Sequence, residues 1–193
     1  MTGTPDWLVR AIGGKEPASA LTAATLVDEK TFGKNGFTLS SPAFSDGDQL
    51  DPSFTAYEED AVAPPLEWSA PPPGAMELVL IVEDADSDNS LCHWLVWGLA
   101  SQKGKLLEGE VPPRVGKNSR GNSEWLLPSP SDAEGEHRYV FQLFAVDLPI
   151  TLMPGATKEA LVEAIEDHIV GASILTGRFS APEQEEWDED EEA

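Results

Sequence analysis

Hydrophobic positions are densest in three stretches of the chain. Residues 78–82 read Leu-Val-Leu-Ile-Val, with an apolar side chain at every position. Residues 91–98 and 138–146 are similar, and both are rich in aromatic and β-branched residues. Because a strand with one buried face alternates between apolar and polar positions, these continuous runs indicate strands that are buried on both faces.

Weaker patterns predict shorter strands around these three. Phe37 and Leu39 alternate with polar residues, which predicts a half-buried strand. Residues 64–68 (Pro-Pro-Leu-Glu-Trp) indicate a short strand or a sheet edge, since proline cannot donate to a strand ladder. Residues 171–179 predict a final strand. Residues 101–135 are dominated by Gly, Pro, Ser and charged residues, and they predict a long surface segment.

Three segments carry helical signals. Thr4-Pro5-Asp6 predicts a helix start with Thr4 as N-cap, and residues 18–27 predict a second short helix. Thr157 is expected to cap a helix of about 12 residues, because apolar side chains then recur at four-residue intervals. These apolar positions are Leu161, Ile165 and Ile169.

The elements together predict a mainly β chain with one core. A length of 193 residues suffices for one well-buried core and is short for two. The 16 glycines and 16 prolines fall between short apolar runs, as expected for a loop-rich β protein. We expect residues 1–35 to be a helical N-terminal extension, residues 36–181 to form the domain, and residues 182–193 to be a disordered acidic tail.

The formal net charge of −23 narrows the classes of partner. A chain this acidic lacks the basic surface that neutralises phosphates, so nucleic acid is not expected as a partner. The same field repels anionic bilayers, so no stable membrane association is expected either. A small anion would therefore have to bind in an enclosed site where local groups overcome the global field.

The single cysteine and the absence of long apolar runs bear on the cellular compartment in which the protein is expected. Cys92 excludes an intrachain disulfide and lies in an apolar stretch, so we interpret it as core packing, with a reactive thiol as the alternative. No run reaches the roughly 18 residues of a membrane span. Asp6 and Arg10 interrupt the place where a signal peptide needs an apolar segment. We expect a cytoplasmic protein, and the sequence leaves a homodimer open.

The candidate chemistry lies at strand ends. Asp84 ends the strand around 78–83, and His93 begins the next strand after a polar loop. In an antiparallel pair these two ends meet, so Asp84 and His93 are expected to share one rim. His137 also begins a strand, but the spacing alone does not bring it there. His168 falls on the predicted helix and is interpreted as structural or exposed.

These residues lie in segments that resemble the phosphatidylethanolamine-binding protein family. Residues 82–87 (Val-Glu-Asp-Ala-Asp-Ser), followed by His93 at a strand start, resemble the first signature, D-P-D-x-P and then a histidine. Residues 135–141 (Gly-Glu-His-Arg-Tyr-Val-Phe) match the second signature, G-x-H-R-Y. The segments around 41–44, 64–68 and 152–157 also resemble the bacterial, Raf-kinase-inhibitor-like branch.

The resemblance implies a β-sandwich-like fold with a few short peripheral helices and a rim pocket for phosphate or other small anions. It assigns ligand binding to Asp84, Asp86, His93, His137 and, from the second signature, Tyr139. Both prolines of the first signature are replaced here, by Ala85 and Asp88. Because proline stiffens a loop by fixing φ, this wall of the pocket is expected to be looser than in relatives.

The residue types themselves suit an anion. Two imidazoles can each donate an N–H to a phosphate oxygen, and protonation strengthens both bonds. A carboxylate beside a histidine fixes its tautomer and favours its protonated form. On the strand from His137, Tyr139 shares the same face and could be a third donor, whereas Arg138 points to the other face and is expected to pair with acids there.

Other classes of function remain alternatives. A hydrolase would use the Asp/His/His set, but no G-x-S-x-G elbow is present, and Ser119 and Ser123 lie in polar loops. A metal-dependent enzyme would use two histidines and one aspartate, at intervals that match no known motif. The family resemblance implies a third alternative, a regulator of a kinase or protease, with a protein as partner. We expect a non-catalytic protein with no cofactor and no metal.

Overall fold

The strands of the protein form two facing antiparallel sheets. The structure, a computed structural model, describes residues 3–183. The larger sheet has the strand order β6-β4-β3-β7-β8. Its strands are β3 (Glu77–Asp84), β4 (Cys92–Ala100), β6 (Arg114–Val115), β7 (His137–Val146) and β8 (Ile169–Phe179). The three dense apolar runs of the sequence are β3, β4 and β7, at the centre of this sheet.

The smaller sheet covers one face of the larger one. Its order is β1-β2-β5, with β1 (Leu39–Ser40), β2 (Leu66–Trp68) and β5 (Gly104–Leu106). The predicted strand at 64–68 is therefore the middle strand and not an edge. Pro64 and Pro65 precede the paired residues, so their missing N–H groups do not interrupt the ladder.

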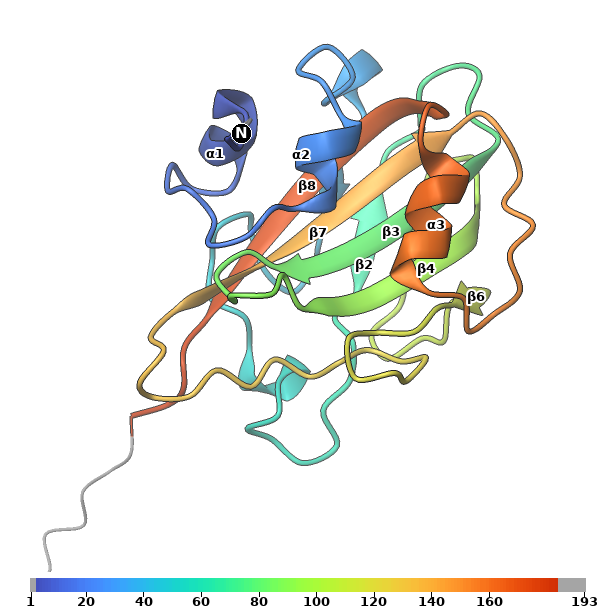
Figure 1. Ribbon diagram of the computed structural model, residues 1–193. Helices are drawn as coiled ribbons and strands as arrows, with labels where there is room; N and C mark the ends of the chain where they lie inside the picture. The colour runs from blue at the N-terminus through green and yellow to red at the C-terminus, as the bar shows by residue number, and fades with distance from the viewer. Residues whose placement is uncertain (1–2, 184–193) are drawn as a thin grey trace, which may run out of the picture.

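Helices cover the opposite face of the larger sheet (Figure 1). They are α1 (Asp6–Ala11), α2 (Thr22–Leu26) and α3 (Lys158–Ile165), and two 3-10 turns, Lys34–Gly36 and Pro52–Phe54, lie in the loops. One apolar core fills the space between the sheets, and a second lies between the larger sheet and the helices. Every residue of β3 and β7 is consequently buried, which explains why apolar residues occupy neighbouring positions along both strands and do not alternate with polar ones.

The helices are shorter than the sequence suggests. Pro5 and not Thr4 is the residue that precedes α1, and α2 covers five residues of the predicted 18–27. The Thr157 side chain caps α3 as predicted, accepting a hydrogen bond from the Ala160 N–H at 3.2 Å. The helix ends at Ile165 because Glu166 leaves the helical conformation, with a ψ of 136°, and Asp167 then adopts a positive φ of 65°. Ile169 therefore begins β8.

The prediction that residues 101–135 form one long surface segment is wrong. The segment contains β5 and β6, and it sends Trp125 into the core between the sheets. The Trp125 indole Nε1 donates to the Phe54 carbonyl at 3.1 Å. Most of the predicted acidic tail, residues 184–193, lies outside the described residues. Among residues 3–183, no helix has the length and apolar character needed to cross a membrane.

Candidate functional site

The site begins with a buried contact between Asp84 and His137. Strand β7 is hydrogen-bonded to β3 on the side opposite β4, and its register sets Tyr139 across from Asp84. His137 lies two residues before Tyr139, on the same face. The His137 Nδ1 atom is 2.6 Å from Asp84 Oδ2, and both side chains are more than nine-tenths buried. The topology of the larger sheet thus brings His137 to the rim.

A β-bulge brings His93 to the same face. Trp94 pairs with Val82, but Cys92 pairs with Glu83, so His93 is an extra residue in β4. Trp94 packs in the core between the sheets, whereas Cys92 packs on the helix side. The extra residue breaks the alternation, and the His93 ring joins the side of Trp94 and Tyr139. The three rim residues therefore come from the adjacent strands β4, β3 and β7.

Of the two ring nitrogens of His93, Nδ1 has a hydrogen-bond partner among the described residues and Nε2 has none. Its Nδ1 lies 2.7 Å from the Leu126 carbonyl oxygen, and the Leu126 N–H donates back to the His93 carbonyl at 2.8 Å. Because a carbonyl only accepts, Nδ1 carries a proton. The buried Nε2 atom has no hydrogen-bond partner among the described residues. A buried polar atom without a partner costs free energy, unless a ligand or water satisfies it.

Burial sets the protonation of the site. It lowers the pKa of His93, although the Leu126 carbonyl and the charge of Asp84 act in the opposite direction. The free site therefore favours a neutral His93 with a lone pair on Nε2. Burial and the nearby Asp84 charge raise the pKa of Tyr139, so its hydroxyl stays protonated and able to donate.

Tyr139 lies against both histidines. Its ring meets the His93 ring edge-on at a centroid distance of 5.1 Å and lies nearly parallel to the His137 ring at 6.5 Å. Trp125 packs on the other side of the site, with its ring centroid 6.1 Å from that of His93. The structure thus gathers Asp84, His93, His137 and Tyr139 into one aromatic-walled cluster.

Asp86 is the predicted site residue that the structure does not bring to the histidines. Its two carboxylate oxygens accept hydrogen bonds from the Arg138 guanidinium at 2.8 Å, on the other face of β7. Burial raises the pKa of Asp86, but the hydrogen bonds and charge of Arg138 outweigh it and leave the pKa below its ordinary value. Asp86 supports the site through its N–H, which donates to Asp84 Oδ1 at 2.9 Å.

Arg138 pairs with an acid on the far face, as the strand alternation indicates. It also donates to the carbonyls of Ile12, Lys15 and Glu16 at 3.2, 2.7 and 3.3 Å. One guanidinium therefore joins the N-terminal extension to the strand that carries His137. Arg138 directly follows His137 in β7, so the extension is attached next to the site.

Two contributors to the site were missed in the sequence. Trp125 and the Leu126 carbonyl belong to the segment that was interpreted as surface. The signal for them is weak but present: Trp-Leu-Leu at 125–127 is the one apolar triplet in an otherwise polar stretch. Such a triplet indicates a buried anchor within a loop.

The enzyme alternatives gain no support from the geometry. Among residues 3–183, no group of three His, Cys, Asp or Glu side chains is arranged to hold a metal ion. The Ser119 hydroxyl, one of the two serines considered as nucleophiles, accepts a hydrogen bond from the Cys92 N–H at 2.7 Å. It is thus engaged in holding the loop to the start of β4.

The sequence of this chain is similar to that of known proteins. The sequence profile of the family described as "Phosphatidylethanolamine-binding protein" matches residues 40–180. A UPF0098 protein of Chlamydia trachomatis is 36% identical over 148 residues, which cover 73% of this chain and 97% of the relative. A Mycobacterium tuberculosis protein named as a candidate lipoprotein, LppC, is 35% identical over 185 residues, with 89% and 91% covered.

Solved structures show the same architecture. The crystal structure of a homologue of the family from Chlamydia trachomatis superimposes with a TM-score of 0.71 at 33% identity, covering 76% of this chain and 98% of that one. An Escherichia coli member has a TM-score of 0.69 at 19% identity, with 76% and 99% covered. The second likeness concerns the fold alone.

Proposed function

The chain belongs to the phosphatidylethanolamine-binding protein family, and on that premise we propose that Asp84, His93, His137 and Tyr139 bind a small phosphate-bearing anion. The observation that carries the proposal is the His93 Nε2 atom, which is buried beside the Asp84–His137 pair and has no hydrogen-bond partner among residues 3–183. A phosphate oxygen or a phosphate hydroxyl supplies the missing partner.

Each of the four residues has its own role in binding the anion. Asp84 holds the Nδ1 proton of His137, which leaves Nε2 of that ring for the ligand. Leu126 does the same for His93. A neutral His93 accepts from a protonated phosphate oxygen, and a protonated His93 donates to an ionised one. The Tyr139 hydroxyl adds a donor.

Binding is then linked to a proton. Burial lowers the pKa of His93 in the free protein. The negative charge of a bound phosphate stabilises the imidazolium and therefore raises that pKa. Affinity is therefore highest at low pH and falls as the pH rises through the histidine range. Titration calorimetry of the full chain with inorganic phosphate, across this range, tests the relationship.

The variant His137→Ala supplies the comparison. It removes one donor and leaves the Asp84 carboxylate to repel the anion, so we expect affinity to fall by about tenfold or more. His168→Ala is the matched control, since His168 pairs with Asp147 at the exposed end of α3, and it should leave the titration unchanged. Equal, pH-independent affinities for the wild type and His137→Ala would refute the proposal.

A further inference from the structure

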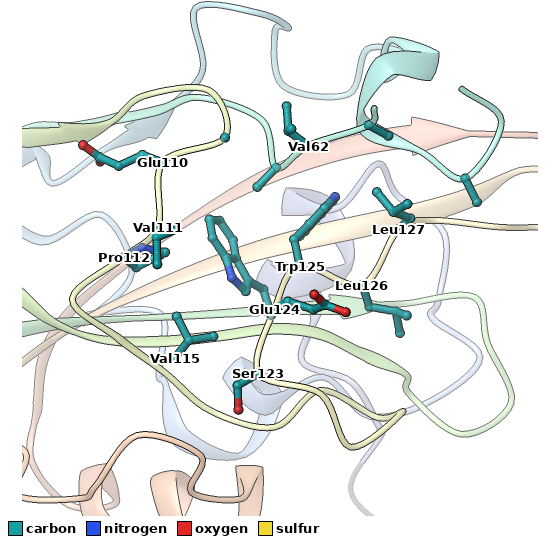
Figure 2. A pocket seen from close by; sticks show the side chains of 15 residues that line it. Val62, Glu110, Val111, Pro112, Val115, Ser123, Glu124, Trp125, Leu126 and Leu127 are labelled. Carbon is teal, nitrogen blue, oxygen red and sulfur yellow. The ribbon is translucent and has the colours of Figure 1, made fainter. Parts of the chain in front are cut away.

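A second cavity shares a wall with the candidate site. It has a volume of about 580 Å³, within the range of ligand and peptide-side-chain pockets. Residues 123–127 form one side, and the loop 109–112 forms the other (Figure 2). Its lining does not include His93 or His137. We call this cavity the Trp groove, after Trp94 and Trp125 in its lining.

The Trp groove has an apolar floor and an exposed apolar rim. The Trp94 and Trp125 rings meet edge to face, with centroids 5.6 Å apart. At the rim, Val111 is 84% exposed and Val62 is 38% exposed. Both lie among the few large apolar side chains that the described residues leave open to solvent. Clustered exposed apolar surface of this kind marks an interaction site.

The charges around the Trp groove are all of one sign. Among the described residues that line it, the charged side chains are Glu110 and Glu124, and no Lys, Arg or His is present. Glu124 stands immediately before Trp125, and Glu110 immediately before Val111 (Figure 2). A carboxylate therefore accompanies the apolar surface on each side of the opening.

This arrangement disfavours two occupants. The chain's own end, residues 183–193, carries eight acids and no base, so Glu110 and Glu124 would repel it. A second copy of the chain brings a net charge of −23 against an equal charge. A partner of opposite charge gains from both carboxylates and from the field of the whole protein, which speeds its approach.

We propose that the Trp groove docks a segment of a basic partner protein. The segment places a large apolar side chain against Trp94 and Trp125 and sets a Lys or Arg beside Glu110 and Glu124. The lining of the Trp groove shares Trp125 and Leu126 with the surroundings of His93 but includes neither histidine, so the docking inference does not depend on the proposed function.

Two peptides of the same apolar sequence test the charge rule on the full chain. The probes are acetyl-Lys-Phe-Leu-Lys-amide and acetyl-Glu-Phe-Leu-Glu-amide, titrated into isotope-labelled protein and followed by NMR. We expect the basic probe to shift the Val111 amide and the Trp125 indole N–H, and to bind at least about tenfold more tightly than the acidic probe at low salt. Added salt should reduce this preference.

Substitutions then assign the effect to two carboxylates. The double variant Glu110→Gln/Glu124→Gln should weaken the basic probe by about fivefold, the loss expected for two exposed ion pairs. Glu108→Gln is the control, because Glu108 is exposed on the same loop but does not line the groove. The far-UV circular dichroism spectrum and the urea unfolding curve of both variants report whether the fold is intact.

Three results would overturn the proposal. The first is equal binding of the two probes, or no binding of either. The second is a change in the Val111 and Trp125 signals of the free protein after removal of residues 184–193, which would make the chain's own end the occupant. The third is a concentration-dependent dimer whose contacts fall on Val111 and Trp125, which would make a second copy the occupant.

Discussion

The His137 Nδ1 atom lies 2.6 Å from Asp84 Oδ2 in a part of the protein from which water is nearly excluded. The two residues are 53 positions apart and come from neighbouring strands. A hydrogen bond to a buried carboxylate fixes which nitrogen of the ring carries the proton and leaves the other nitrogen for a ligand. The site is thus prepared for an anion before any ligand arrives.

Replacing the carboxylate tests this preparation. In Asp84→Asn the side chain keeps its shape, but the carboxylate that accepts the His137 Nδ1 hydrogen bond is replaced by an amide. We expect the dissociation constant for phosphate to rise by about tenfold or more, as measured by calorimetry near pH 6. Asp147→Asn is the control, because Asp147 holds His168 at 2.9 Å in a pair that is nearly half exposed. An unchanged constant in Asp84→Asn would separate Asp84 from binding.

The low pKa of His93 predicts how stability depends on pH. The unfolded chain protonates this histidine near pH 6.5, whereas the folded chain does so at a lower pH because the ring is buried. Between these two values the unfolded state binds more protons, so the free energy of unfolding falls as the pH decreases from 6.5. The slope from one histidine is at most about 1.4 kcal/mol per pH unit.

Urea unfolding between pH 7.5 and 5.5 checks this. His93→Gln keeps a polar side chain but cannot titrate, so its stability curve should be flatter than that of the wild type. Saturating phosphate should flatten the wild-type curve as well, because the ligand favours the protonated ring. Parallel curves for the wild type and His93→Gln would contradict the assignment of the slope to this residue.

The elements around the site could be predicted because their signals are local. The apolar runs in β3, β4 and β7 reflect burial on both faces, and the polar loop after Asp84 predicts the antiparallel contact with His93. The meeting of His137 with Asp84 has no such signal. It depends on the insertion of β7 beside β3, a pairing between distant parts of the chain, and before the structure it rested on the family resemblance alone.

The directions of several side chains also could not be predicted from the sequence. The bulge at His93 reverses the face on which strict alternation would place this ring, and nothing in the residues 91–98 specifies it. Asp86 belongs to the same signature as Asp84, yet its loop turns it toward Arg138. Trp125 lies in a polar segment whose path across the sheet is set by tertiary contacts and not by periodicity.

Arg138 is expected to be the main attachment of the N-terminal extension. In Arg138→Met the Asp86 carboxylate remains buried without its partner, and three carbonyls of the extension lose their donor. The free energy of unfolding should fall by about 3–5 kcal/mol in urea. Arg10→Met removes a pair with Glu29 that is more than two-thirds exposed, and it should change stability by less than about 1 kcal/mol. Similar losses in both variants would be inconsistent with this role.

A buried carboxylate on the helix side of the larger sheet gives a further prediction about stability. Glu83 is fully buried and accepts from the Lys158 ammonium at 2.6 Å, and also from the Thr22 N–H and the Gln142 amide at 2.8 Å each. Burial lowers the pKa of Lys158, but the charge and hydrogen bond of Glu83 outweigh it and leave that pKa raised. The stabilisation by this pair is therefore present at neutral pH and is lost as the pH rises above about 10.4.

The variant Lys158→Met should show how much the Lys158–Glu83 pair contributes to the free energy of unfolding. It leaves Glu83 charged and buried beside an apolar side chain, so the free energy of unfolding should fall by about 3 kcal/mol or more at pH 7. Lys105→Met, at an exposed position of β5, is the matched control and should be nearly neutral. If Lys158→Met were as stable as the control, the Lys158–Glu83 pair would make no net contribution to stability.

Cys92 should behave as a core residue and not as a nucleophile. Burial and the nearby charge of Glu83 raise the pKa of its thiol to about 12, so the reactive thiolate is scarce at neutral pH. We expect iodoacetamide at pH 8 to leave Cys92 unmodified in the native protein and to alkylate it after unfolding in urea, as measured by the mass of the intact chain. Rapid modification of the native wild type would instead place Cys92 on an accessible surface.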